Sequence, residues 1–237
     1  MPMRLLRMML ALMAVAVIGA GAVNGAAAQD VEEVEDEFDF SQLEGVEQVV
    51  GRTYSIDFAA LMPASPEAIE DMAYPTGIVT AFAVVAKFDG DDNAEAGWET
   101  LREAFGEQAA TMIGTEDAEV TEVEVEDLAD NAAGYAATVE EDGTTFNVTI
   151  LLLREGEYAY VSAVTTGGDD ATEPATGLAE AMIDADAGDG EGEANEDGEY
   201  SGGLWDKIPE EGADAVEGLI IATDERIYPE TEDTAEE

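Results

Sequence analysis

Apolar and polar residues alternate along much of the chain, and this alternation predicts a β-sheet. In residues 54–58, apolar side chains alternate with polar ones, which is the period of a half-buried strand. Because Gly51 interrupts the apolar run within residues 46–58, that segment predicts two short strands around the glycine. Residues 78–88 are almost continuously apolar and rich in β-branched side chains, which is typical of a strand buried on both faces of a sheet.

Further strands are predicted where short turns separate apolar segments. Gly143 and Gly156 each follow an acidic residue in a tight turn signal. Turns this short join antiparallel neighbours, so we expect an antiparallel meander. The predicted strands are residues 119–126, 134–140, 144–153 and 158–165, with Tyr135, Ala137 and Val139 sharing one face of the second and Phe146, Val148, Ile150 and Leu152 sharing one face of the third.

Two segments repeat apolar residues at spacings of three and four, which predicts amphipathic helices. Asp92 or Asn93 can cap the first helix, and Gly114 suits its C-terminal end. The predicted core-facing stripe of this helix consists of Trp98, Leu101, Phe105, Ala109 and Met112. The second helix is predicted over residues 176–186, with Leu178, Met182 and Ile183 directed inward.

The order of these elements predicts an α+β fold. One long helix precedes the meander and another follows it, so we expect an antiparallel sheet of about five to seven strands with two packed helices. This order, beginning with the segment YSIDFAALMP, resembles the sandwich of the PsbP/Mog1-like superfamily over roughly residues 46–186. That superfamily includes non-enzymatic binding and assembly modules, so the resemblance implies a binding role rather than catalysis.

The first residues have the three parts of a secretory signal peptide. Arg4 and Arg7 form a positive start, an apolar run follows, and small residues precede Gln29. The rival interpretation is a retained membrane anchor. Because the apolar run is shorter than the ~20 residues that cross a bilayer, we expect cleavage after Ala28, a Sec-type route to an extracytoplasmic location, and no membrane span in the mature chain.

The remaining chain divides by composition into a domain with acidic appendages. The predicted organisation is a signal peptide at 1–28, an acidic disordered arm at 29–45, a single α+β domain at 46–186, an acidic Gly-rich linker at 187–203, an apolar segment at 204–229 and an acidic tail at 230–237. The apolar segment either folds back onto the domain or docks onto a partner, and an exposed apolar patch favours the first. Its candidate docking residues are Leu204, Trp205, Ile208, Leu219 and Ile220.

Charge is the most unusual property of this sequence. Asp and Glu number 57 and Lys and Arg only 8, which gives a formal net charge of -49. Nucleic acids and anionic membranes are poor partners for such a chain, because binding them needs clustered basic residues. The acids are spread over the whole chain, which resembles the surfaces of halophilic proteins. An ordinary secreted acidic protein is the alternative.

The residue types present argue against the common forms of catalysis. The chain has no Cys and no His, so neither a Ser-His-Asp nor a Cys-His arrangement can form. A Ser-Lys pair would need Lys87 or Lys207, and nothing in the sequence near either residue points to a partner serine. A hydrolase that uses two carboxylates stays open, although with so many acids any such pair is uninformative.

Calcium is the cation that this composition favours, because it binds several oxygen ligands. The best candidates are Glu193, Asn195, Asp197 and Glu199, which follow the first half of an EF-hand loop with Gly198 at its sixth position. Glu replaces the usual first ligand and Leu204 stands where the final Glu belongs, so an ordinary acidic linker is the competing interpretation. No other cofactor is expected.

Together these observations predict an exported, non-enzymatic binding or assembly module whose partner is an unknown protein or small ligand. An extracytoplasmic calcium-binding protein and a carboxylate-dependent hydrolase are the two alternatives. A sequon, Asn147-Val148-Thr149, lies within one of the predicted strands.

Overall fold

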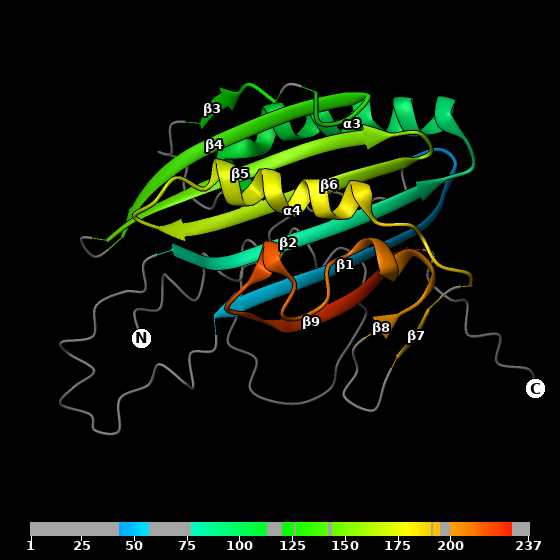
Figure 1. The fold of residues 1–237 in the computed structure, drawn as a ribbon. Coiled ribbons are helices and arrows are strands. Elements are labelled where there is room, and N and C mark those ends of the chain that lie inside the picture. The colour runs from blue at the N-terminus through cyan, green and yellow to red at the C-terminus, as the bar shows by residue number, and fades with distance from the viewer. Residues whose placement is uncertain are drawn as a thin grey trace, which may run out of the picture.

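A seven-stranded antiparallel sheet with an α-helix on each face forms the body of the protein (Figure 1). The computed structural model describes residues 43–56, 77–112, 120–125, 127–141, 144–190, 192–194 and 200–228. Within these residues it contains two α-helices, so the predicted α+β class is confirmed.

The sheet has the strand order β3-β4-β5-β6-β2-β1-β9, and every neighbouring pair is antiparallel. The strands are β1 (Val46–Ile56), β2 (Gly77–Phe88), β3 (Val120–Val123), β4 (Asn131–Glu141), β5 (Thr144–Glu155), β6 (Tyr158–Gly167) and β9 (Leu219–Tyr228). Strands β3 to β6 pair as the antiparallel meander that the sequence predicts, although β3 is shorter than the predicted strand at 119–126. A separate two-stranded pair, β7 (Glu193–Ala194) with β8 (Tyr200–Ser201), lies within the segment predicted as a linker.

The first strand differs from its prediction, because β1 is one continuous strand rather than two. Gly51 lies in the middle of β1, opposite Val84 of β2 and Glu225 of β9. Backbone partners on both sides hold the glycine in an extended conformation, which its sequence context alone does not require. Strand β2 is buried along nearly its whole length, as its continuous apolar run predicts.

Helix α3 (Asp91–Met112) covers one face of the sheet. Three residues of the predicted stripe, Trp98, Leu101 and Phe105, are buried. Tyr135, Ala137 and Val139 of β4 share this face with Val148, Ile150 and Leu152 of β5, whereas Phe146 belongs to the core on the opposite face. The side chains of Ala109 and Met112, and Gly114, lie outside the described residues.

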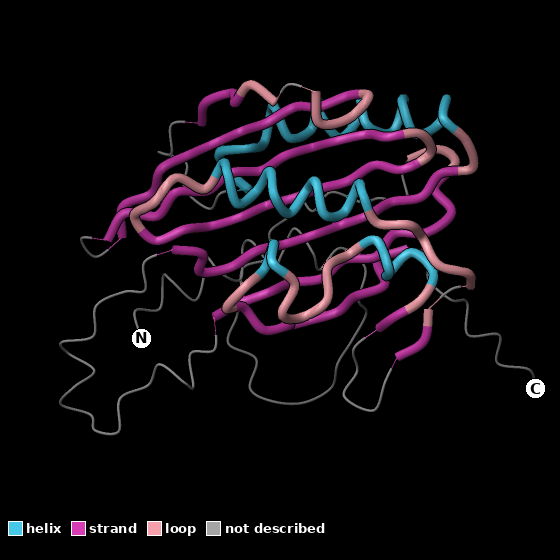
Figure 2. The backbone as a smooth tube through the Cα atoms, in the orientation of Figure 1, coloured by secondary structure: helices cyan, strands magenta, loops and turns pink. Residues whose placement is uncertain are grey.

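Helix α4 (Thr172–Asp184) packs on the opposite face, over β6, β5 and β2. It begins at Thr172, before the predicted start at residue 176, and Asp170 accepts a hydrogen bond from the N–H of Thr172 at 2.7 Å. Leu178 and Met182 are buried as predicted, and Ile183 is partly buried. Figure 2 shows α4 running along the middle strands, with the C-terminal turns on the same side of the sheet.

The C-terminal segment completes this second face. The 3-10 turns η3 (Gly203–Lys207) and η4 (Asp214–Val216) lead into β9, which pairs with β1 at the sheet edge. Of the five candidate docking residues, Leu204, Trp205, Ile208 and Leu219 are buried in the protein's own core, and Ile220 is 38% exposed. These four side chains are therefore not available to a partner in this structure. They are buried because the C-terminal segment is long enough to fold back over β1 and β2.

Several predicted segments lie outside the described residues. They are the signal peptide at 1–28, the acidic arm except for residues 43–45, and the acidic tail at 230–237. Leu43, at the end of the predicted arm, is 6% exposed and packs with the α3 core. Among the described residues, no helix has the length and apolar character needed to cross a membrane.

Candidate functional site

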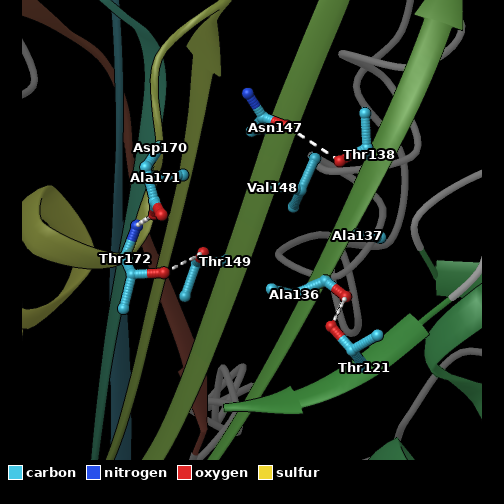
Figure 3. A pocket seen from close by; sticks show the side chains of 10 residues that line it. All are labelled: Thr121, Ala136, Ala137, Thr138, Asn147, Val148, Thr149, Asp170, Ala171 and Thr172. Carbon is cyan, nitrogen blue, oxygen red and sulfur yellow. Dashed lines mark hydrogen bonds between the residues drawn. The ribbon is translucent and has the colours of Figure 1, made fainter.

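A groove open to solvent lies on the α4 face of the sheet, where β3, β4 and β5 extend beyond the helix. Its volume is about 740 Å³. We call it the threonine groove, because its polar lining consists of Thr121, Thr138, Asn147, Thr149, Asp170 and Thr172; three alanines and Val148 complete it (Figure 3). A pocket of this volume is within the usual range for small-ligand sites.

Strand register places the groove's side chains in two rows. Thr121 of β3, Ala136 of β4 and Thr149 of β5 lie opposite one another, and Thr138 lies opposite Asn147 in the next row. These side chains share a face because residues two apart on a strand point the same way. The small side chain of Ala136 leaves the floor of the groove open.

Hydrogen bonds fix the orientation of these polar side chains. The Thr138 hydroxyl donates to Asn147 Oδ1 at 2.9 Å, and Asn147 Nδ2 donates to the carbonyl of Asp169 at 2.8 Å. The hydroxyls of Thr149 and Thr172 are 3.3 Å apart and tie β5 to the start of α4. The Thr121 hydroxyl donates to the carbonyl of Ala136 at 3.3 Å. The groove is thus lined by side chains that are already positioned before any ligand arrives.

Asp170 supplies the groove's formal charge. The backbone N–H and the hydroxyl of Thr172 hold the pKa of the Asp170 carboxyl below its usual value, so this group stays ionised at neutral pH. Its exposed position at the rim lets it accept a hydrogen bond from a ligand. No basic residue lines the groove within the described part of the chain.

The basic residues whose side chains the structure describes make contacts elsewhere in the protein. Arg52 pairs with Asp224, Lys87 with Glu47 and Arg154 with Asp130. The Lys207 amino group donates to the Ala185 carbonyl at 2.6 Å. Arg102 lies over the ring of Trp98, with its guanidinium carbon 5.6 Å from the ring centre.

A second polar cluster, which we call the Arg52 cluster, is buried beneath the C-terminal segment. The Arg52 guanidinium donates to Asp224 and to the carbonyls of Pro209 and Tyr200, and it lies 5.7 Å from the ring centre of Trp205. Tyr54 donates its hydroxyl to the carbonyl of Pro209. The side chains of Arg52 and Asp224 are 2% and 0% exposed, so this cluster is a structural connection rather than a site open to ligands.

The predicted calcium ligands receive no support from the described geometry. Glu193 lies exposed on β7, and Asn195, Asp197 and Glu199 lie outside the described residues. Among the residues that the structure describes, no three acidic side chains come together as metal ligands would. Described residues on either side of this segment meet, since the N–H of Gly188 donates to the carbonyl of Gly203 at 2.9 Å.

Sequence reasoning did not identify the threonine groove as a site. Thr138 and Asn147 occupy the polar positions of two predicted strands, and polar positions on strands usually face solvent without function. The sequon at Asn147 drew attention to one of these residues for a different reason. In the folded protein its amide is bonded within the groove and Thr149 is only 1% exposed, so both ends of the sequon are engaged.

No family model, curated protein or solved structure matches this chain.

Proposed function

We propose that this protein is an exported, non-enzymatic binding module that holds its ligand in the threonine groove. The observation that carries the proposal is the groove itself, a solvent-open hollow of about 740 Å³ whose polar side chains are fixed by their own hydrogen bonds. Side chains that are ordered before binding lose little entropy when a ligand arrives, which favours affinity. The resemblance to the PsbP/Mog1-like superfamily in element order agrees with a binding role.

Both exposed edges of the sheet are less suitable for a partner. Strand β3 has four residues, which is too short for extensive strand pairing. Strand β9 is longer, but its register with β1 shifts twice, between Val49 and Val50 and between Thr53 and Tyr54. Such bulges protect an edge strand from pairing with another chain. The groove is thus the better candidate surface.

Catalysis is not favoured at the groove. Asp170 is the one carboxylate that lines it among the described residues, so the two carboxylates that a glycoside hydrolase needs are not paired there. The Thr172 hydroxyl bonds to the Asp170 carboxylate, but that carboxyl has a pKa below its usual value and is therefore a weak base for activating a nucleophile. The site supports binding better than bond cleavage.

The test of this proposal is binding by the mature chain and by a variant whose groove is filled. Thr138 is exposed on the groove's wall, so Thr138→Trp places an indole in the groove without disturbing the core. Titration calorimetry would use three probes: a neutral trisaccharide, tetralysine and a neutral tetrapeptide. We expect saturable binding of one probe class and its loss in Thr138→Trp.

The matched control is Thr100→Trp, which changes an exposed threonine of α3 on the opposite face of the sheet. Binding by this control should equal that of the unchanged chain. If Thr138→Trp leaves the binding of every probe unaltered, the groove is not the binding site and the proposal fails.

Export and calcium binding are tested separately. N-terminal sequencing of the protein secreted by its host should begin at Gln29, and a chain that keeps residues 1–28 would contradict cleavage. Calorimetry with calcium chloride in concentrated potassium chloride should show no saturable site. A saturable site there would instead favour the calcium-binding alternative.

A further inference from the structure

We infer that the threonine groove takes a neutral, polyhydroxylated ligand of the carbohydrate class. This inference rests on the proposed function and goes beyond it by naming the chemistry of the ligand. It follows from which hydrogen-bonding atoms of the groove remain unused, from the charge around them and from the arrangement of the two rows.

The hydrogen-bonding capacity that the groove offers to a ligand consists mainly of acceptors. The Thr121 hydroxyl donates its single proton to the carbonyl of Ala136, and the Thr138 hydroxyl donates its proton to Asn147 Oδ1. Both hydroxyl oxygens keep lone pairs that can accept from a ligand. Asn147 Oδ1 already accepts from Thr138, and Nδ2 gives one of its two protons to the carbonyl of Asp169, which leaves one N–H as a donor. The ionised carboxylate of Asp170 only accepts. A ligand must therefore bring donors, as a sugar does with each of its hydroxyls.

Anionic ligands do not fit this arrangement. Phosphates and carboxylates bring acceptors, which would face the acceptors of Thr121, Thr138 and Asp170. No basic side chain lines the groove among the described residues, and the net charge of the chain is -49. Both the local chemistry and the overall field oppose an anion.

Cationic ligands bring donors but gain little at this place. The carboxylate of Asp170 already accepts from the Thr172 N–H at 2.7 Å, and it lies beside the positive end of the α4 dipole. A cation would find the protein's other carboxylates, spread over the whole surface, equally attractive. A neutral polyol instead uses the fixed acceptors of the groove.

The arrangement of the groove fits an extended chain of sugar units. Each row runs across neighbouring strands, which are about 4.8 Å apart, and the two rows are separated by about 6.8 Å along the strands. Thr121 and Thr138 are both exposed at the ends of this grid. Ring hydroxyls on neighbouring sugar units can donate to both residues at once.

The experiment titrates the mature chain with maltotriose, cellotriose and laminaritriose, with tetralysine and trigalacturonate as the charged comparisons. We expect at least one neutral trisaccharide to bind, with an affinity that changes less than about twofold between dilute and molar potassium chloride, because neutral hydrogen bonds are not screened by salt. Trigalacturonate should not bind.

Isosteric variants test the residues that accept from the ligand. Thr138→Val and Thr121→Val each remove one acceptor and should weaken trisaccharide binding about fivefold, which corresponds to about 1 kcal/mol for one hydrogen bond. Thr100→Val on the opposite face is the control and should bind as the unchanged chain does. Equal binding by all three variants would overturn the inference.

Two other outcomes separate this inference from the proposed function. If tetralysine binds, is displaced in Thr138→Trp and weakens steeply with salt, the groove is a binding site but its ligand is cationic, and the inference fails alone. If none of the neutral trisaccharides binds saturably, the inference also fails. If no probe responds to Thr138→Trp, the groove is not a site and both fail.

Discussion

The Arg52 side chain on β1 and the Asp224 side chain on β9 form a two-point ion pair in the interior of the protein. Nε of Arg52 lies 2.5 Å from Oδ1 and Nη2 lies 2.8 Å from Oδ2 of Asp224. Burial alone lowers the pKa of Arg52, but the hydrogen bond and charge of Asp224 outweigh it and raise the pKa. The pair connects residues 172 positions apart and fastens the C-terminal strand to the sheet.

Breaking this ion pair should destabilise the protein strongly. Asp224→Asn leaves the Arg52 guanidinium charged and buried without its counterion, which typically costs about 3–5 kcal/mol. The double variant Arg52→Met with Asp224→Leu removes both charges, and its loss should be smaller than that of Asp224→Asn. Urea unfolding of the two variants and the unchanged chain measures this. A double variant at least as destabilised as Asp224→Asn would show that the unpaired buried charge is not what costs stability.

Two helix glycines should respond in opposite directions to the same substitution. A Cβ atom at Gly97 on α3 would lie 2.5 Å from the ring of Phe88, which is fully buried. We expect Gly97→Ala to cost about 1–3 kcal/mol, because the ring has no room to move.

Gly177 on α4 is the matched control, since a Cβ there meets nothing within 4 Å. Gly177→Ala should stabilise the protein by about 0.5–1 kcal/mol, because alanine is the better helix former. Thermal unfolding of both variants provides the comparison. A gain in stability for Gly97→Ala would contradict the close packing of α3 on Phe88.

Stability should fall at alkaline pH because of buried tyrosines. Burial raises the pKa of Tyr54 and of Tyr160 above the ordinary value of 10.0. Above pH 10 the unfolded chain releases these protons and the folded chain keeps them, so unfolding becomes easier as the pH rises. The loss is about 1.4 kcal/mol per pH unit for each tyrosine.

The comparison of Tyr160→Phe with the unchanged chain isolates one of these groups. Above pH 10, the free energy of unfolding of Tyr160→Phe should decline less steeply than that of the unchanged chain. The difference in slope should be about 1.4 kcal/mol per pH unit, because one titrating group has been removed. Burial lowers the pKa of Lys207, so this residue makes stability rise with pH up to about 10.5. Its contribution is the same in both proteins and cancels in the comparison. Identical pH slopes for the two proteins would refute a role for Tyr160.

Salt should stabilise the folded chain. The net charge is -49, and the basic residues with described side chains are already engaged, so most of the acidic repulsion is left uncompensated. In molar potassium chloride the screening length falls to about 3 Å and this repulsion weakens. We expect the urea midpoint to rise between dilute buffer and molar salt.

The control for charge screening is the same pair of urea unfolding curves, in dilute buffer and in molar salt, measured near pH 4. Many carboxylates are protonated there, so the effect of salt on the urea midpoint should shrink. A salt response of equal size at both pH values would point to salting-out of apolar surface instead. A protein equally stable in dilute buffer and in brine at neutral pH would contradict the charge interpretation altogether.

The sequence by itself determined the class of fold and most of its elements. Hydrophobic period alone predicts β2, the meander β4 to β6 and both helices, because each of these buries a face that its own local pattern defines. The turn at Gly156 is equally local, and it sets the antiparallel pairing of β5 with β6. The apolar residues Leu204 and Trp205 also marked the C-terminal segment as one that had to be covered.

Only the tertiary structure decided how distant segments meet. Gly51 lies within one continuous strand because β2 and β9 pair on either side of it, and no local pattern specifies β9 as its neighbour. Arg52 and Asp224 looked like ordinary polar residues until the C-terminal strand brought them together. The threonine groove likewise depends on strand register and on where α4 begins. Such features arise from long-range pairing, which a periodic pattern along the chain does not encode.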